Sequence, residues 1–212
     1  MEGSLAVGRR REVLALAAGW VVTRGAGSAW ATTGVGQVLS STGLADVVRG
    51  NAVIALAAGD AVYAEDIVRT GPDSRLQIVC NDGLQIVVGA GTELAVRSYL
   101  TSTSDGRLEI LLGLLRGIAR LIGGASPTPR TVEIDTRTAV ASVRSTEWLI
   151  ESTDKGTAVL AIQGEVTVLG LAGGRVVLEP GQGTDVAPGA APRTPATWGQ
   201  ARRLDAIART TI

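Results

Sequence analysis

Apolar and polar residues alternate along short segments of this chain, and glycine-rich or polar turns separate the segments. The clearest stretch, Thr131 to Leu169, predicts strands at 132–134, 139–143 and 146–151, then a hairpin of 158–162 and 165–169 closed at Gln163-Gly164. Trp148 shares one face of its strand with the other even positions, and Glu147 shares the opposite face with Glu151. The run 158–162 is apolar on both faces, which predicts a position between two layers of sheet.

Similar short strands are expected from Gly34 onward. We predict them at 35–39, 45–49, 52–56, 67–70, 75–80, 84–88, 93–97 and 175–178. Gly71-Pro72-Asp73 is a strong breaker, and Asn81-Asp82-Gly83 is the clearest hairpin signal in the chain. A polar loop is expected at 102–106. Strands every ten residues or so, with turn signals between them, favour a sandwich, a barrel or a solenoid.

Residues 107–122 are open to two interpretations. A helix drawn over this segment has one apolar side, made of Leu111, Leu114, Leu115, Ile118 and Leu121. Gly113 and Gly117 oppose a helix, since each glycine costs roughly 1 kcal/mol against alanine there. The alternative is two strands that turn at Gly113.

The end of the chain predicts a linker followed by a short amphipathic helix. Residues 186–194 are rich in Pro, Ala and Gly, which indicates a surface linker. Thr194 is the expected N-cap and Pro195 suits the first turn. An apolar stripe of Trp198, Ala201, Leu204 and Ala208 is expected to pack on the sheet.

Composition supports a β protein and leaves little catalytic chemistry. The 212 residues include 28 Gly, no Phe and only 3% aromatic residues, and the formal net charge is zero. A neutral chain gives no reason to expect nucleic acid as a partner. Histidine is absent and Cys80 is the only cysteine, so no intrachain disulfide can form and the usual zinc and copper ligands are scarce. We expect no metal and no cofactor.

Residues 1–31 resemble a secretory signal. Arg9-Arg10-Arg11 precedes the apolar run Val13–Val22, and Ala29-Trp30-Ala31 fits a cleavage site. Arg24 ends the apolar character before the roughly 20 residues that a membrane anchor needs. We expect cleavage, no stable membrane span afterwards, and a periplasmic or secreted location. The arginines fit either a twin-arginine signal or an ordinary Sec signal.

Several short motifs, taken in order, resemble the FecR domain family. They are Gly59-Asp60, Asp66 to Gly71 (which contains Arg69 and Thr70), Ser74-Arg75-Leu76, Asp82-Gly83, Thr92-Glu93-Leu94, Val143-Arg144-Ser145-Thr146-Glu147-Trp148, Ala161 to Val166 (which contains Gly164 and Glu165) and Val177 to Gly183. Ser145 stands where the family prefers Gly. The resemblance implies an all-β fold, an elongated two-layer sandwich with solenoid character, over residues 32–190, and residues 191–212 would hold the linker and helix. It also favours two strands turning at Gly113 over a helix at 107–122, and we adopt that interpretation.

The resemblance also implies a function without catalysis. Family members take part in envelope signalling and ferric-siderophore uptake, so the expected partner is a receptor or a membrane-anchored regulator. We interpret Arg144, Thr146, Glu147, Trp148, Gly164 and Glu165 as structural, with Trp148 as a core anchor. Candidate partner contacts are Asp66, Arg69, Thr70, Asp82 and Gly83.

An exported glycan-binding or glycan-cleaving protein is the alternative function. Glu147 and Glu151 lie on one strand face, and pairs of carboxyl groups serve glycoside hydrolysis. Acidic residues that alternate along a strand are more often its solvated face. Few aromatic residues are present for sugar stacking, and without histidine no Ser-His-Asp or Cys-His arrangement can form. The FecR-like interpretation is therefore favoured.

Overall fold

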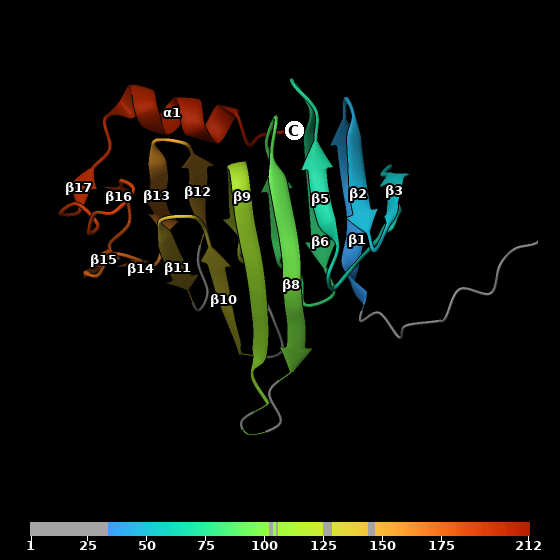
Figure 1. Cartoon of the computed structure of the whole chain (residues 1–212), viewed down its shortest axis with the longest axis horizontal. Helices are drawn as coiled ribbons and strands as arrows, with labels where there is room; N and C mark the ends of the chain where they lie inside the picture. The colour runs from blue at the N-terminus through green and yellow to red at the C-terminus, as the bar shows by residue number, and fades with distance from the viewer. Residues whose placement is uncertain (1–33, 102–103, 105, 125–128, 144–146) are drawn as a thin grey trace, which may run out of the picture. The chain divides into compact units, whose positions relative to one another are not determined.

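The computed structural model describes residues 34–101, 104, 106–124, 129–143 and 147–212. They form a two-layer β-sandwich with one helix near the C-terminus (Figure 1). The predicted all-β fold with a short C-terminal helix is confirmed. No helix within the described ranges has the length and apolar character needed to cross a membrane.

One layer, called sheet A here, holds nine strands. Their order from edge to edge is β4 (Ala61–Tyr63), β1 (Gly34–Thr42), β6 (Arg75–Cys80), β7 (Gln85–Val88), the second part of β9 (Leu108–Ile122), β12 (Glu147–Thr153), β13 (Gly156–Gln163), β16 (Gln182–Val186) and β17 (Ala196–Thr197). All of these pairings are antiparallel.

The other layer, sheet B, begins at β3 and ends at β15. Its order is β3 (Ala52–Ala55), β2 (Ala45–Arg49), β5 (Ile67–Thr70), β8 (Glu93–Thr101), the first part of β9, β10 (Arg130–Asp135), β11 (Ala139–Val143), β14 (Val166–Gly170) and β15 (Arg175–Leu178). The pairing of β9 with β10 is parallel and the others are antiparallel. The chain passes repeatedly from one layer to the other, which gives the sandwich its solenoid character.

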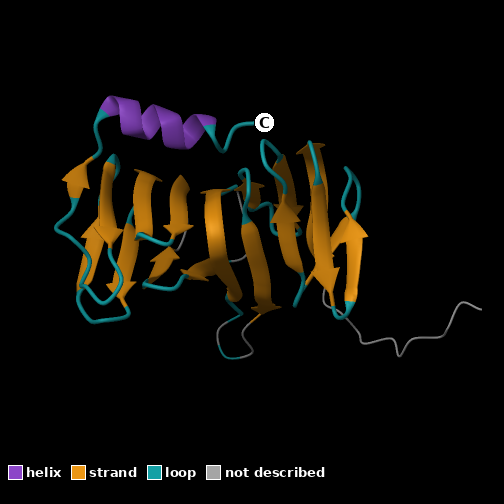
Figure 2. Ribbon diagram, turned by 45° about the horizontal axis from the view of Figure 1, so that its top comes forward, coloured by secondary structure: helices purple, strands orange, loops and turns teal. Residues whose placement is uncertain are grey.

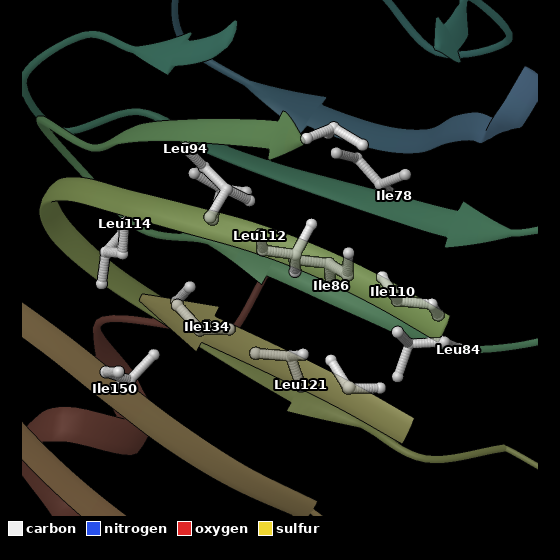
Figure 3. Packing of buried hydrophobic residues seen from close by; sticks show 14 of the residues in the cluster. Ile78, Leu84, Ile86, Leu94, Ile110, Leu112, Leu114, Leu121, Ile134 and Ile150 are labelled. Atoms are coloured by element: carbon white, nitrogen blue, oxygen red, sulfur yellow. The ribbon is translucent and has the colours of Figure 1, made fainter. Parts of the chain in front are cut away.

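Alternation of side chains along the strands builds the core between the layers. Inward-facing residues such as Ile86, Leu112 and Leu121 are buried and meet residues of the opposite sheet (Figure 3). Trp148 is also fully buried in this cluster, as its strand face predicts.

Strand β9 replaces the predicted pair of strands at 107–122. It is one continuous strand, and Gly113 pairs with Ala95 on one side and Asp135 on the other, so the predicted turn at Gly113 is wrong. The chain instead crosses from sheet B to sheet A at Gly117, which has a φ of +92°. Thr92 holds this crossing, because its Oγ1 accepts a hydrogen bond from Ile118 N (3.0 Å) and donates one to Ile118 O (3.2 Å).

The predicted hairpin at Gln163-Gly164 is also wrong. Both strands exist, but β13 belongs to sheet A and β14 to sheet B, so the turn is a corner between the layers. Gly164 has a φ of +70°, which favours glycine at this corner. A two-residue turn with glycine looks the same in sequence whether the next strand pairs or changes layer.

Helix α1 (Gln200–Ala208) lies across the strand direction at one end of the β structure (Figure 2). Ala206 and the preceding Trp198 pack on Ile118, Leu149 and Leu160 of sheet A. The run 158–162 therefore lies between sheet B and this helix rather than between two sheets, because Val159 and Ala161 face the inter-sheet core and Leu160 faces α1.

The expected details of the C-terminal segment need three corrections. The helix begins at Gln200 after Gly199 as N-cap, and not after Thr194, because β17 extends to Thr197. Ala206 is the helix residue buried on the sheet, whereas Leu204 of the predicted stripe is 53% exposed. Strand β16 was not predicted at all.

Candidate functional site

Asp66, a predicted partner contact, is buried in an ion pair inside the fold. Its carboxylate accepts two hydrogen bonds from Arg49, from Nε to Oδ1 and from Nη2 to Oδ2, each 2.7 Å long, and one from Tyr63 N at 2.9 Å. The Arg49 guanidinium lies 4.4 Å from the centre of the Tyr63 ring. The hydrogen bond to Asp66 raises the pKa of Arg49. The carboxylate is fully shielded from solvent, so its contacts join β2, β4 and the start of β5.

Arg69 and Thr70 follow on the same segment and have different environments. Arg69 lies on the outer face of sheet B, where its Nε is 2.6 Å from Asp46 Oδ1, and the side chain is partly exposed. Thr70 is buried; its Oγ1 donates to Gly89 O (2.6 Å) and accepts from Thr92 N (3.0 Å). Of these two predicted contacts, Arg69 is the side chain that a partner can reach.

Asp82 and Gly83 form the turn between β6 and β7, as predicted, and Asp82 is held by a second buried ion pair. Its Oδ2 is 2.7 Å from Arg130 Nη1, and its Oδ1 accepts a hydrogen bond from the Tyr99 hydroxyl at 3.1 Å. Arg130 is 3% exposed and also donates to Gly124 O. Burial, with the nearby Asp82 charge, raises the pKa of Tyr99 above its ordinary value. This network ties the turn in sheet A to β8 and β10 in sheet B.

The acidic residues of β12 are paired with arginines on the outer face of sheet A. Glu147 pairs with Arg120 of β9, and Glu151 Oε1 is 2.5 Å from Nη2 of Arg209, the C-cap of α1. Neither carboxylate is free to act as a general acid or base. Arg144 and Thr146, from the same predicted motif, lie outside the described residues.

Sequence reasoning missed the arginine partners of all these acids. Arg49, Arg120 and Arg130 are 17 to 48 residues distant from their partners along the chain, so no local spacing connects them. Arg49 and Arg120 lie on strands beside apolar residues, whereas Arg130 opens β10 between Pro129 and Thr131. An arginine beside apolar strand residues needs a carboxylate nearby, so the sequence does indicate that Arg49 and Arg120 are paired, without showing with which acids.

The outer face of sheet B carries a hollow of about 660 Å³, which we call the sheet B hollow. It is lined by Thr131, Ser142, Val143, Glu165, Thr167, Leu169 and Arg175. Ser142 and Thr167 lie directly opposite each other on β11 and β14. Glu165 is exposed here, just after the Gly164 corner, and Arg175 supplies the opposite charge. With its hydroxyl groups, one acidic and one basic side chain, the hollow is suited to contact with a polar surface of another protein.

A smaller cavity of about 300 Å³ lies beside the helix. Its lining includes Lys155 and Arg193 together with the Asp185–Arg202 ion pair. The Arg202 guanidinium also stacks 3.6 Å from the Trp198 ring centre. Both signs of charge are present, and Asp185 is already neutralised by Arg202.

The described residues offer no assembled catalytic or metal-binding group. Within those ranges no cluster of three or more His, Cys, Asp or Glu side chains could hold a metal ion. Cys80 is buried, and burial, followed by the nearby Asp82 charge, raises the pKa of its thiol to about 12. A thiol with this pKa is neutral at physiological pH and is a poor nucleophile.

The FecR protein family model matches residues 66–167, a range that begins at Asp66 and contains the Asp82–Arg130 ion pair, the β9 crossing and the Gly164 corner. The chain contains a FecR domain. The family resemblance drawn from the sequence motifs is therefore confirmed.

Solved structures of similar fold include two crystal structures, at 2.50 and 1.65 Å resolution respectively, of a protein from Parabacteroides distasonis ATCC 8503 assigned as an anti-sigma factor. The TM-scores are 0.52 and 0.51, with 19% and 16% sequence identity. Each alignment covers 65% of this chain and 62% of the other. At such low sequence identity, the structural likeness shows a shared fold and nothing more. No curated protein matches the chain.

Proposed function

We propose that this chain is an exported, non-catalytic protein that acts in envelope signalling by binding another protein through its FecR domain. The match of residues 66–167 to that family is the observation that carries the proposal. The fold shared with a protein assigned as an anti-sigma factor supports a regulatory role. The proposed partner is a receptor or a membrane-anchored regulator, and the proposal includes a link to iron uptake, which the family resemblance suggests.

The chemistry of the acidic residues supports binding over catalysis. Glu147 and Glu151 were the best candidates for glycoside hydrolysis, and both are paired with arginines. The catalytic carboxyl groups of a glycosidase must reach the glycosidic bond, whereas these two carboxylates are engaged in ion pairs with side chains of the same domain. The sheet B hollow contains hydroxyl groups but no aromatic ring for sugar stacking. The glycan alternative is therefore not favoured.

The outer face of sheet B is the better partner surface of the two outer faces. On sheet A, α1 covers Leu149 and Leu160. On sheet B, the outward side chains of β10, β11, β14 and β15 are half-buried or exposed, and the exposed Leu169 and Val177 lie beside the hollow. Apolar residues flanking a polar centre are suited to a transient protein interface.

A photo-crosslinking amino acid at Thr167, in the centre of this face, tests the proposal in living cells. We expect it to capture a receptor, a sensor or a membrane-anchored regulator. The same group at Gln37, exposed on sheet A, is the control and should not capture that protein. Thr167→Arg should abolish the complex without unfolding the domain. Hydrolysis of a glycan that Glu147→Gln or Glu151→Gln abolishes would refute the proposal.

Export is tested separately. We expect the mature protein to begin at Thr32, because Ala31 ends the only well-placed cleavage site in the sequence. Mass spectrometry of exported material that retains residues 1–31 would contradict this. Arg10→Lys with Arg11→Lys should block export by the twin-arginine route, and unchanged export would assign the Sec route.

A further inference from the structure

The two ends of the sandwich differ in how their edge strands are protected. At the β15 and β17 end, Pro192 closes over the β14–β15 turn, since its Cδ would lie 2.7 Å from a Cβ on Gly170 and 3.1 Å from one on Gly174. The segment that carries it is held at Arg193, whose N donates a hydrogen bond to Asp185 O and whose O accepts one from Thr184 Oγ1. Strand β17 has only two residues, and β15 begins with a charged one. Short strands, charges and covering loops are the usual means of protecting an edge.

Strand β3, at the opposite end, is as short as β15 but lacks the charge that protects β15. Its sequence, AVIA, contains no charge and no proline, and all four residues are exposed. Ile54 lies opposite Val47 and so faces inward, yet it is 42% exposed whereas Val47 is fully buried. The inter-sheet core is therefore open beside β3.

A cavity of about 170 Å³ marks this opening, and we call it the β3 slot. Its apolar lining comes from Val47, Ile54, Leu56, Ala61 and Tyr63, with Arg49 and Asp60 also lining it. One more strand added to sheet B would continue the core here, provided that it presents an aliphatic side chain inward.

The backbone of β3 shows which groups such a strand would meet. Leu56 N donates to Ala45 O of β2, 2.9 Å away. Backbone groups of alternate residues point to the same side of an antiparallel strand, so Ile54 also pairs with β2. The N–H and C=O groups of Val53 and Ala55 then point away from β2, towards the free edge.

We propose that β3 pairs with β3 of a second copy of this chain, antiparallel and about a two-fold axis. The two Ile54 residues lie opposite each other, and each Val53 exchanges hydrogen bonds with Ala55 of the other copy. This register uses all the free backbone groups of Val53 and Ala55 and extends sheet B through both molecules.

The sequence of β3 makes it the strand that the slot requires. A strand that fits must present one aliphatic residue inward, and Ile54 meets this requirement. The strand carries no charge, so no like charges meet across the axis. Two-fold dimers, in which the same patch serves on both subunits, are the commonest oligomers.

Sedimentation of the purified exported protein at increasing concentration tests the proposal. We expect a monomer in equilibrium with a dimer. Ala55→Pro removes one edge N–H per copy without touching the β2 pairing, and should weaken dimerisation at least about tenfold while the circular dichroism stays unchanged. Val53→Lys should also weaken it. Val177→Lys is the matched control, because Val177 is an exposed, outward-facing valine on the edge strand at the other end, and it should leave the dimer intact.

A cysteine substitution tests the register. Residues facing each other in a non-hydrogen-bonded antiparallel pair lie close enough for a disulfide. Ile54→Cys should therefore form a disulfide-linked dimer under oxidising conditions, and Val177→Cys should not; the native Cys80 is buried. A single monomeric species at every concentration would overturn the proposal. The proposal would also be overturned if the Ile54→Cys variant formed a dimer without a disulfide, or a disulfide to a different protein.

Discussion

Gly117→Ala tests whether the crossing of β9 between the layers is as constrained as its geometry indicates. Gly117 has a φ of +92°, in a region where an L-residue with a side chain is strained by about 1–2 kcal/mol. A Cβ at this position would lie 2.5 Å from Thr92 Cα and would also collide with the Thr92 side chain. Part of this collision involves backbone, so a rotamer change cannot relieve it. Overpacking of this kind costs about 1–3 kcal/mol.

The two contributions predict a loss of about 2–5 kcal/mol in the free energy of unfolding. Urea denaturation followed by tryptophan fluorescence measures it. For a slope of about 2 kcal/mol per molar urea, the midpoint should fall by about 1 M or more.

Gly59→Ala is the matched control for this experiment. Gly59 has the same φ of +92°, but a Cβ there would meet nothing within 4 Å. It should lose only the backbone contribution, about 1–2 kcal/mol. Equal losses in the two variants would show that Thr92 moves freely and would refute the argument that this crossing is tightly packed.

Three further predictions follow from the core and the buried ion pairs. Trp148→Ala should lower the free energy of unfolding, measured by urea denaturation, by about 3–5 kcal/mol. Trp148→Phe should lower it clearly less, because Nε1 has no hydrogen-bond partner among the described residues. A loss well below 1 kcal/mol for Trp148→Ala would place the indole outside the core. Arg130→Met should cost about 3–5 kcal/mol by leaving Asp82 buried without its partner, and adding Asp82→Asn should recover part of the loss; purely additive losses would deny the coupling. The pKa of Cys80 rises from 9.0 to about 12 on folding, so the unfolded thiol ionises first and stability should fall as the pH rises from about 9 to 12. Cys80→Ala should reduce this alkaline loss, and an unchanged urea midpoint from pH 8 to 11 in the wild-type protein would contradict the prediction.

The strands of this domain could be predicted well from sequence because their pattern is local. Strands β2, β5, β6, β11 and β15 have the predicted bounds, and the Asn81-Asp82-Gly83 turn joins β6 to β7 as expected. Alternation with a period of two, closed by glycine or asparagine, needs only neighbouring residues to be recognised. The burial of Trp148 also followed from the face of its strand.

What the sequence could not predict is where each strand lies in space. The apolar pattern of β9 resembles a helix because Leu114 and Leu121 face the inter-sheet core while Ile118, beyond the crossing, faces α1. The corner at Gly164 resembles a hairpin for a similar reason, because turn chemistry does not say which strand will be the neighbour.

The partner candidates show the same limit. Asp66 and Asp82 stand in turn sequences that suggest exposure, yet arginines from distant strands bury both of them. A single sequence contains both members of each pair and gives no sign of which acid meets which base. The sheet B hollow was missed because Ser142 and Thr167 come from strands that are adjacent only in the folded protein.

The position of β9 has a consequence for the order in which the domain can fold. Strands β8 and β7 pair with one edge of β9, and strands β10 and β12 pair with the other. The strands before β9 pair among themselves, and so do the strands after Ile122, so the strand pairing of the two halves meets at β9. A chain that emerges N-terminus first can build the first half early and hold β9 as its growing edge. Damage to β9 would leave that half intact but with a long unpaired edge, the kind of surface through which partly folded β proteins aggregate.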